Sequence, residues 1–166
     1  MASPEQTINA LKARFDDLSV SEFRGDTRVV VPKGGLLDVC EHLWHEGGFD
    51  YLVEITCVDY LNYRGATDRF GLVYIVRSTE TNVELTLRVM LNEPDLTVPS
   101  LTHLWEGANW LEREVYDLFG ITFAGHPDLR RIVLPEEFTA HPLRKDYPMQ
   151  GRGERHNFPV LRRDDA

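Results

Sequence analysis

Two acidic side chains in the stretch EREVYDLFG, residues 112–120, are the residues of this sequence best suited to chemistry. Glu114 and Asp117 lie three positions apart, which would place both on one face of a helix with Trp110. Two neighbouring carboxylates can act as general acid and base, or as metal ligands, when their pKa values are driven apart. The same residues could instead form a solvated face or bind a partner protein, so three interpretations stay open.

The other charged residues of this stretch have a simpler local explanation. Asn109 followed three positions later by Glu112 is a capping-box pattern, which is typical of the first turn of a helix. Arg113 and Asp117 are four positions apart and would form an ion pair along the helix. Gly120 then predicts the helix end. The apolar stripe of this helix would consist of Leu111, Val115, Leu118 and Phe119.

Histidine and cysteine provide no complete metal site in the sequence. His42 and His45 are three positions apart on a predicted helix and supply half a site, without an evident third ligand. Cys40 and Cys57 form no C-x-x-C pair and lie on apolar stripes, so we expect both to be core thiols. No glycine-rich phosphate loop follows a predicted strand. We therefore expect a chain without a metal or cofactor of its own.

The composition is that of an ordinary water-soluble domain. The 166 residues are 42% hydrophobic and 27% charged, which is enough for one core. The net charge of -9 disfavours nucleic acid and acidic lipid surfaces as partners. The first residues lack a signal peptide, and no apolar run approaches the roughly 18 residues that span a bilayer. We expect a cytoplasmic protein that reaches a membrane only through partners.

Apolar periodicity predicts the elements that would position the acidic helix. Helices are expected after the capping residue Ser3, over 34–46 and over 100–107. Strands are expected over 19–23, 27–31, 51–57, 70–76 and 83–91. The first two strands would form a hairpin with Gly25 and Asp26 as its turn. This order predicts an α+β fold with an antiparallel or mixed sheet covered by helices.

The segment 121–166 differs from the residues before it. It contains five of the nine prolines, which rules out long helices and disfavours central strands. It carries eight basic against seven acidic residues, whereas residues 1–120 carry the negative charge of the chain. Apolar residues are spread along it. We therefore expect a globular α+β domain over 1–120 and an extended proline-rich tail over 121–166, called the strap, which packs on its own domain or on partner subunits.

A longer pattern joins the acidic helix to the strap. EREVYDLF is followed by His126, by Arg130 and by HPLRKDYP at 141–148. This joined motif resembles the 30-kDa subunit family of bacterial NADH:quinone oxidoreductase, respiratory complex I, which includes the C subunit of that complex. The resemblance covers nearly the whole chain, and the motif is far more specific than a lone E-R-E.

The resemblance implies a peripheral-arm subunit on the cytoplasmic side of the inner membrane. It would pack against the quinone-site subunit and the iron–sulfur subunits, and FMN, the clusters and quinone would belong to those partners. This chain would hold no cofactor and supply no catalytic residue. The resemblance implies an interaction role for Glu112, Arg113, Glu114, Asp117, His126, Arg130, Arg131, His141, Arg144, Lys145, Asp146 and Tyr147.

Two alternatives stay open beside this reading. The chain could be the equivalent subunit of a related membrane-bound hydrogenase or quinone-linked complex, or an independent enzyme that uses Glu114 and Asp117. In the favoured interpretation, Glu114 and Asp117 pair with basic residues of the strap, within the chain or across an interface. Those basic residues are Arg130, Arg131, Arg144 and Lys145.

Overall fold

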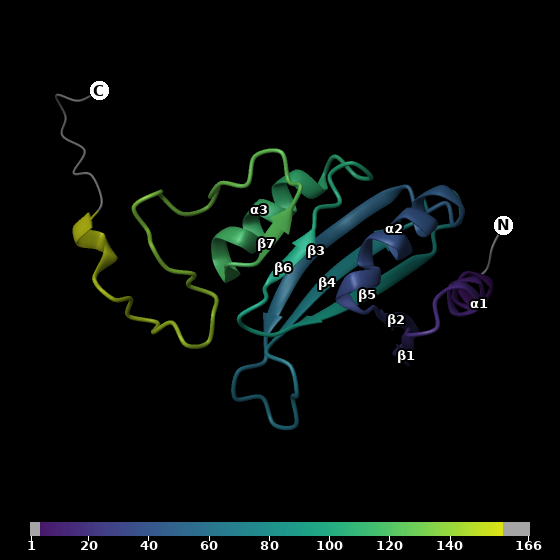
Figure 1. Cartoon of the computed structure of the whole chain (residues 1–166), viewed down its shortest axis with the longest axis horizontal. Helices are drawn as coiled ribbons and strands as arrows, with labels where there is room; N and C mark the ends of the chain where they lie inside the picture. Colours follow the sequence, from purple (N-terminus) through teal and green to yellow (C-terminus); the bar gives the residue numbers. More distant parts are fainter. Residues whose placement is uncertain (1–3, 158–166) are drawn as a thin grey trace.

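A five-stranded mixed sheet forms the centre of the computed structural model, which describes residues 4–157 (Figure 1). The strands are β1 Ser19–Phe23, β2 Asp26–Val30, β3 Tyr51–Asp59, β4 Phe70–Arg77 and β5 Glu84–Leu91. They lie in the order β1-β2-β5-β4-β3, and only the β2–β5 pair is parallel. A second, two-stranded parallel sheet joins β6 Thr97–Pro99 to β7 Thr122–Ala124. The predicted mixed sheet is confirmed.

Three α-helices accompany the sheet within the part of the chain that the structure describes. They are α1 Pro4–Arg14, α2 Leu36–His45 and α3 Ala108–Phe119, and two 3-10 turns lie at η1 Lys33–Gly35 and η2 Glu154–Asn157. Figure 1 shows α2 lying across the sheet and α3 beside β3. The capping residue proposed for the first helix, Ser3, lies outside the described residues.

The core lies between one face of the sheet and the helices. Ile55, Tyr74 and Leu87 are paired side by side across β3, β4 and β5, and all three are buried. Helix α2 faces them with Leu36, Val39, Cys40 and Leu43. Both cysteines are buried free thiols, as predicted, and burial raises the pKa of Cys57 to about 12.

Two local predictions are wrong. The hairpin turn consists of Arg24 and Gly25, because Phe23 pairs with Asp26. Both turn residues have positive φ, 55° and 89°, which matches the twist of the two strands. The helix expected over 100–107 is a series of turns in which the Leu101 carbonyl accepts two backbone N–H bonds.

The chain remains part of the globular fold just beyond Gly120, since Ile121 and Phe123 are buried and β7 pairs with β6. Residues 125–153 of the strap contain neither an α-helix nor a strand. Figure 1 shows them as an irregular path that runs beyond α3. The rest of the strap beyond residue 157, including Pro159, lies outside the described residues.

Candidate functional site

Helix α3 begins without the side-chain cap that the sequence suggests. It starts at Ala108 after Gly107, and no side chain caps its first turn. Glu112 is fully buried and accepts bonds from the Leu101 N–H and the Ser100 hydroxyl, both at 2.7 Å. Burial raises the pKa of Glu112 to about 7, although these two bonds oppose the shift. Glu112 therefore ties the preceding loop to the helix instead of forming a capping box.

Asp117 anchors the strap to α3. Its Oδ2 accepts backbone N–H bonds from Ile132 at 3.1 Å, Val133 at 2.8 Å and Leu134 at 2.9 Å. Its Oδ1 accepts a 2.6 Å bond from the Arg131 guanidinium. The carboxylate has no exposed surface. One side chain thus satisfies three consecutive backbone donors of a segment that has no sheet or helix partner of its own.

The environment of Asp117 keeps it ionised. Burial alone would raise its pKa, but the N–H donors of the strap and the Arg131 guanidinium outweigh burial and hold the pKa below its ordinary value. A hydrogen bond to a charged group contributes about 1.5–3 kcal/mol, roughly twice a neutral one. The contact is therefore a strong local attachment of the strap.

The predicted ion pair between Arg113 and Asp117 is wrong because both side chains turn toward the strap. The Arg113 guanidinium donates to the carbonyl oxygens of Arg130 at 3.1 Å and Arg131 at 3.4 Å. Its central carbon lies 5.0 Å from the centre of the Trp110 ring. Arg113 and Asp117 are one helical turn apart, and both bind the same stretch of the strap, Arg113 as a donor and Asp117 as an acceptor.

The last turn of α3 receives further donors from the strap. Its free carbonyl groups carry partial negative charge, which favours cationic donors. The Phe119 carbonyl accepts a 2.7 Å bond from Arg144, and the Asp117 carbonyl accepts a 2.9 Å bond from His141 Nδ1. Because a carbonyl can only accept, this nitrogen of His141 carries a proton.

His141 packs closely on the residue that ends the helix. Gly120 has φ 76°, the left-handed conformation in which glycine is favoured. A Cβ atom at this position would lie 2.7 Å from the His141 ring, so a side chain would displace it. Burial, and the charges of Arg131 and Arg144, lower the pKa of His141 despite its bond to the carbonyl. The ring is therefore neutral at neutral pH.

A second buried carboxylate, Asp59 at the end of β3, holds the strap further along. Its Oδ2 accepts the Lys145 backbone N–H at 2.8 Å, and its Oδ1 accepts the Leu61 N–H at 2.9 Å. The Arg69 guanidinium lies 3.6 Å away. Lys145 is therefore bound through its backbone, not through the ammonium group that the charge pattern suggested. Nothing in the local sequence marks Asp59, because its partner lies 86 positions away.

Charged side chains close the contact around Phe70. Arg69 binds Asp146 and Glu93, each at 2.7 Å, and Arg144 binds Glu93 at 3.0 Å. The guanidinium carbons of both arginines lie over the Phe70 ring, 4.8 Å and 5.1 Å from its centre. This network joins the motif residues Arg144 and Asp146 to the edge of the sheet.

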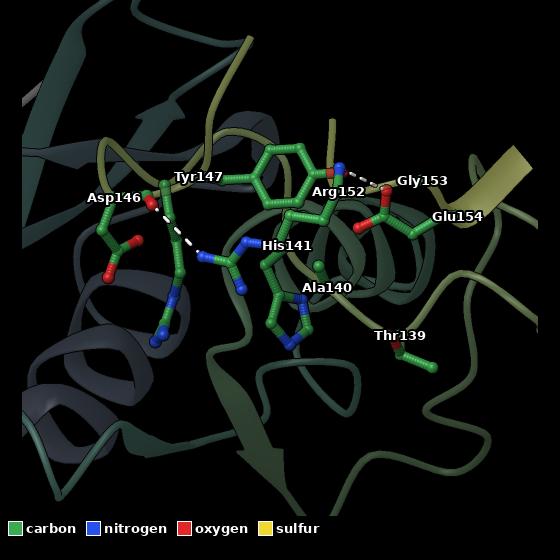
Figure 2. Close-up of a pocket in the computed structure, with 9 residues that line it drawn as sticks. Thr139, Ala140, His141, Asp146, Tyr147, Arg152, Gly153 and Glu154 are labelled. Atoms are coloured by element: carbon green, nitrogen blue, oxygen red, sulfur yellow. Dashed lines mark hydrogen bonds between the residues drawn. The ribbon is translucent and has the colours of Figure 1, made fainter. Parts of the chain in front are cut away.

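The remaining motif residues lie around a hollow within the strap. His141, Asp146, Tyr147, Arg152 and Glu154 line a cavity of about 580 Å³. Figure 2 shows the Arg152 side chain reaching between His141 and Asp146. The Arg152 guanidinium donates to the Asp146 carbonyl at 3.3 Å and lies 5.3 Å from the centre of the Tyr147 ring. The cavity walls are therefore held by contacts within the strap.

His126 and Arg130 make local contacts at the beginning of the strap. His126 Nε2 donates to the Asn109 carbonyl at 3.1 Å, and its Nδ1 accepts the Asp128 N–H at 3.0 Å. Arg130 is exposed and pairs with Asp128 at 2.9 Å. His126 therefore joins the start of α3 to the strap, whereas Arg130 contributes its carbonyl.

The predicted pair of carboxylates on one face of α3 is wrong. Asp117 is buried against the strap, whereas Glu114 is exposed and makes no ion pair with the described residues. Positions three apart on a helix differ in direction by about 60°, which here separates the buried face from solvent. The two carboxylates therefore lie in different environments, Asp117 among hydrogen-bond donors of the strap and Glu114 in solvent.

His42 on α2 contacts two charged side chains. His42 Nδ1 is 3.1 Å from the Arg14 guanidinium and 3.2 Å from the Glu46 carboxylate. Among residues 4–157, no group of three or more histidine, cysteine and acidic side chains has a geometry that could hold a metal ion.

Within the same residues, none of the helices has the length and apolar character that a membrane span requires.

Sequence comparison places the region with these contacts in a known family. The family model described as respiratory-chain NADH dehydrogenase, 30 Kd subunit, matches residues 29–153. The chain belongs to this family. The matched residues include both anchoring carboxylates, Asp59 and Asp117, and the resemblance drawn from the motif is confirmed.

Relatives in the family match over most of their length. The C subunit of NADH-quinone oxidoreductase from Geotalea uraniireducens is 40% identical over 153 residues, 91% of this chain and 92% of the relative. The C subunit from Trichlorobacter lovleyi is 43% identical over 155 residues, 92% of this chain and 94% of the relative. These relatives are named as subunits of an enzyme complex.

Two solved structures share the fold. A chain described as "Nqo5 of the trypsin-resistant fragment (1-134) in P63 form" is 36% identical, with TM-score 0.68, and covers 74% of this chain and 99% of its own. A chain of the membrane-bound sulfane sulfur reductase, an archaeal respiratory membrane complex, is 21% identical, with TM-score 0.75 over 96% of this chain and 93% of its own. The second likeness concerns the fold alone.

Proposed function

We propose that the chain is the C subunit of a proton-translocating NADH:quinone oxidoreductase and acts as a scaffold without catalytic residues. It joins the quinone-site subunit to the iron–sulfur subunits on the cytoplasmic side of the inner membrane. FMN, the iron–sulfur clusters and quinone are bound by those partners, and this chain carries none of them. Family membership and the relatives named as C subunits support this role.

The burial of Asp117 against the strap is the observation that carries the scaffold role. Its carboxylate accepts bonds from four donors of the same chain and has no exposed surface for a substrate. Glu112 is likewise buried in bonds to the preceding loop. The motif carboxylates therefore hold the strap and the preceding loop against α3, and a scaffold requires such fixed segments.

The equivalent subunit of a related membrane-bound complex is the second candidate. The archaeal respiratory complex contains a chain of this fold, so the fold itself is common to more than one kind of complex. Partners distinguish the two: flavin and NADH oxidation should accompany a tagged copy of the chain in the first case, and a nickel–iron subunit in a hydrogenase.

Replacing Arg144 with alanine tests the scaffold role. Arg144 bonds to Phe119 and Glu93 and covers Phe70, so its loss should weaken docking of the strap. We expect Arg144→Ala to lower the amount of assembled complex in membranes while turnover per flavin stays near normal. A catalytic residue would give normal assembly with turnover lower by about a hundredfold or more.

Lys12→Ala is the matched control for this experiment. Lys12 is an exposed cation on α1, outside the residues that the family model matches. It should leave both assembly and turnover unchanged. Normal assembly with lost turnover in Arg144→Ala would refute the scaffold role, and an equal loss of assembly in both variants would show that removal of charge alone is responsible.

A further inference from the structure

An exposed tryptophan on α3 is fixed by the same contacts that dock the strap. Trp110 has 63% of its surface exposed. The Arg113 guanidinium lies against its ring, and the same group donates to the carbonyls of Arg130 and Arg131. The indole is therefore supported on one side and open to solvent on the other.

Two exposed carboxylates lie within four positions of Trp110 in the sequence. Glu114 lies four positions further along α3. Glu106 lies four positions earlier, in the turn before the helix, where its backbone carbonyl accepts the Asn109 N–H. Both are exposed, and neither makes an ion pair with the side chains that the structure describes. The nearby charge of Arg113 is buried and directed to the strap. We call Glu106, Trp110 and Glu114 the Trp110 patch: all three are exposed, Glu114 lies one helical turn beyond the indole, and Glu106 lies in the turn before the helix.

We propose that the Trp110 patch docks another protein subunit of the same complex, which receives the indole in an apolar pocket rimmed by lysine or arginine. The proposal rests on the function proposed above, because it requires a complex. Tryptophan offers a large apolar area with few rotatable bonds, so a ring that is already fixed loses little entropy on binding. Interface residues that contribute most to affinity are enriched in tryptophan.

The charge around the ring decides the kind of partner. The two exposed carboxylates attract a basic protein surface and repel acidic headgroups and nucleic acid, in keeping with the net charge of -9. A second copy of this chain would place like charges opposite each other at the same patch. A basic-rimmed pocket on a different subunit is therefore the occupant that the patch fits.

Competition between two copies of the chain measures the contribution of Trp110. Cells produce the untagged wild-type chain together with a tagged variant, and the ratio of the two is measured in the purified complex and in the whole cell. We expect Trp110→Ala to be depleted from the complex by about thirtyfold, the effect of losing about 2 kcal/mol at a central contact. Tyr51→Ala is the matched control, because Tyr51 is an aromatic residue with 53% of its surface exposed on β3.

Charge reversal tests the rim of the patch. Glu114→Arg should be depleted by about tenfold or more, because the variant would place like charges opposite each other across the interface. The control Glu22→Arg makes the same change at an exposed position of β1 and should not be depleted. Circular dichroism and resistance of the Arg130–Arg131 segment to trypsin check that each variant is folded with its strap docked.

A photo-reactive phenylalanine analogue in place of Trp110, in the purified complex, identifies the partner. We expect a cross-link to a different subunit at a peptide that contains lysine or arginine. A cross-link to lipid or to a second copy, or Trp110→Ala entering the complex as well as wild type, would overturn this proposal alone. Failure of the tagged wild-type chain to bring other subunits and flavin with it would overturn the proposed function as well.

Discussion

Replacing Asp117 with asparagine should free the strap from α3 while leaving the helix in place. Asparagine has the same shape but only one acceptor oxygen, and its amide would face N–H donors that Asp117 now satisfies. The Arg131 guanidinium would also lose its counter-charge. Breaking a buried ion pair by removing one partner costs about 3–5 kcal/mol. We therefore expect docking of the strap to weaken by about this amount.

Native-state hydrogen exchange measures this change at the residues concerned. In the wild type the amides of Ile132, Val133 and Leu134 are bonded to a buried carboxylate and should exchange slowly. A loss of about 3–5 kcal/mol corresponds to exchange that is roughly a hundredfold to several thousandfold faster. Asp117→Asn should show this acceleration, together with faster tryptic cleavage after Arg131.

The control for this experiment is Glu114→Gln, which makes the same chemical change at an exposed position of the same helix. It should leave the exchange of the strap unchanged. Equal exchange at the three amides in Asp117→Asn and the wild type would refute the role of Asp117 as the anchor. So would equal acceleration in Glu114→Gln, because the effect would then come from the charge of the helix as a whole.

The pH dependence of the wild type provides an independent check on the same contact. The pKa of Asp117 is below its ordinary value of 3.8 in the folded chain. Its contribution to stability is therefore complete above that ordinary value and is lost as the pH falls through the lower native pKa. Protection of the strap amides should decrease with acid over this range in the wild type and stay flat in Asp117→Asn.

Three further predictions concern other contacts of the strap and α3. Burial raises the pKa of Glu112 from 4.5 to about 7, so the wild type should lose about 3 kcal/mol of unfolding free energy relative to Glu112→Gln as the pH rises through this range. Unfolding free energies from urea titrations that change equally with pH in both proteins would contradict this. Gly120→Ala should cost at least about 1–2 kcal/mol, seen as a lower Tm, because of its positive φ and the displaced His141 ring; an unchanged Tm would contradict the close packing. Asp59→Asn should speed amide exchange at Lys145, and unchanged exchange there would show that the carboxylate is not its anchor.

The strands and helices of the globular part could be predicted because their signals are local. Alternation of apolar residues marks β3, β4 and β5, and Gly120 marks the end of α3. The parallel pairing of β2 with β5 could not be predicted, because register between distant strands depends on how the whole sheet packs. The turn at Arg24 was missed for a different reason, since arginine rarely adopts a positive φ.

The pairing of Asp117 with a basic residue of the strap was predicted, and Arg131 is that residue, whereas the partners of Glu112 and Arg113 were not predicted. The motif includes Asp117, Arg131 and Arg144, and in the structure all three join α3 to the strap. Local rules assigned Glu112 to a cap and Arg113 to an i,i+4 pair, because such rules consider only one helix. Both side chains are instead buried against segments outside it. Burial against distant segments decides the partners of Glu112 and Arg113, and the sequence of the helix alone does not indicate those segments.

The bond between the Asp59 carboxylate and the Lys145 amide also sets an order of folding. Its two residues are 86 positions apart, and the acceptor lies at the end of β3. Closing so long a loop costs conformational entropy. A few contacts can offset this cost only after the sheet has formed, because the sheet holds the Asp59 carboxylate in place. We expect the strap to dock after the rate-limiting step, so substitutions at this contact should accelerate unfolding and hardly change the rate of refolding.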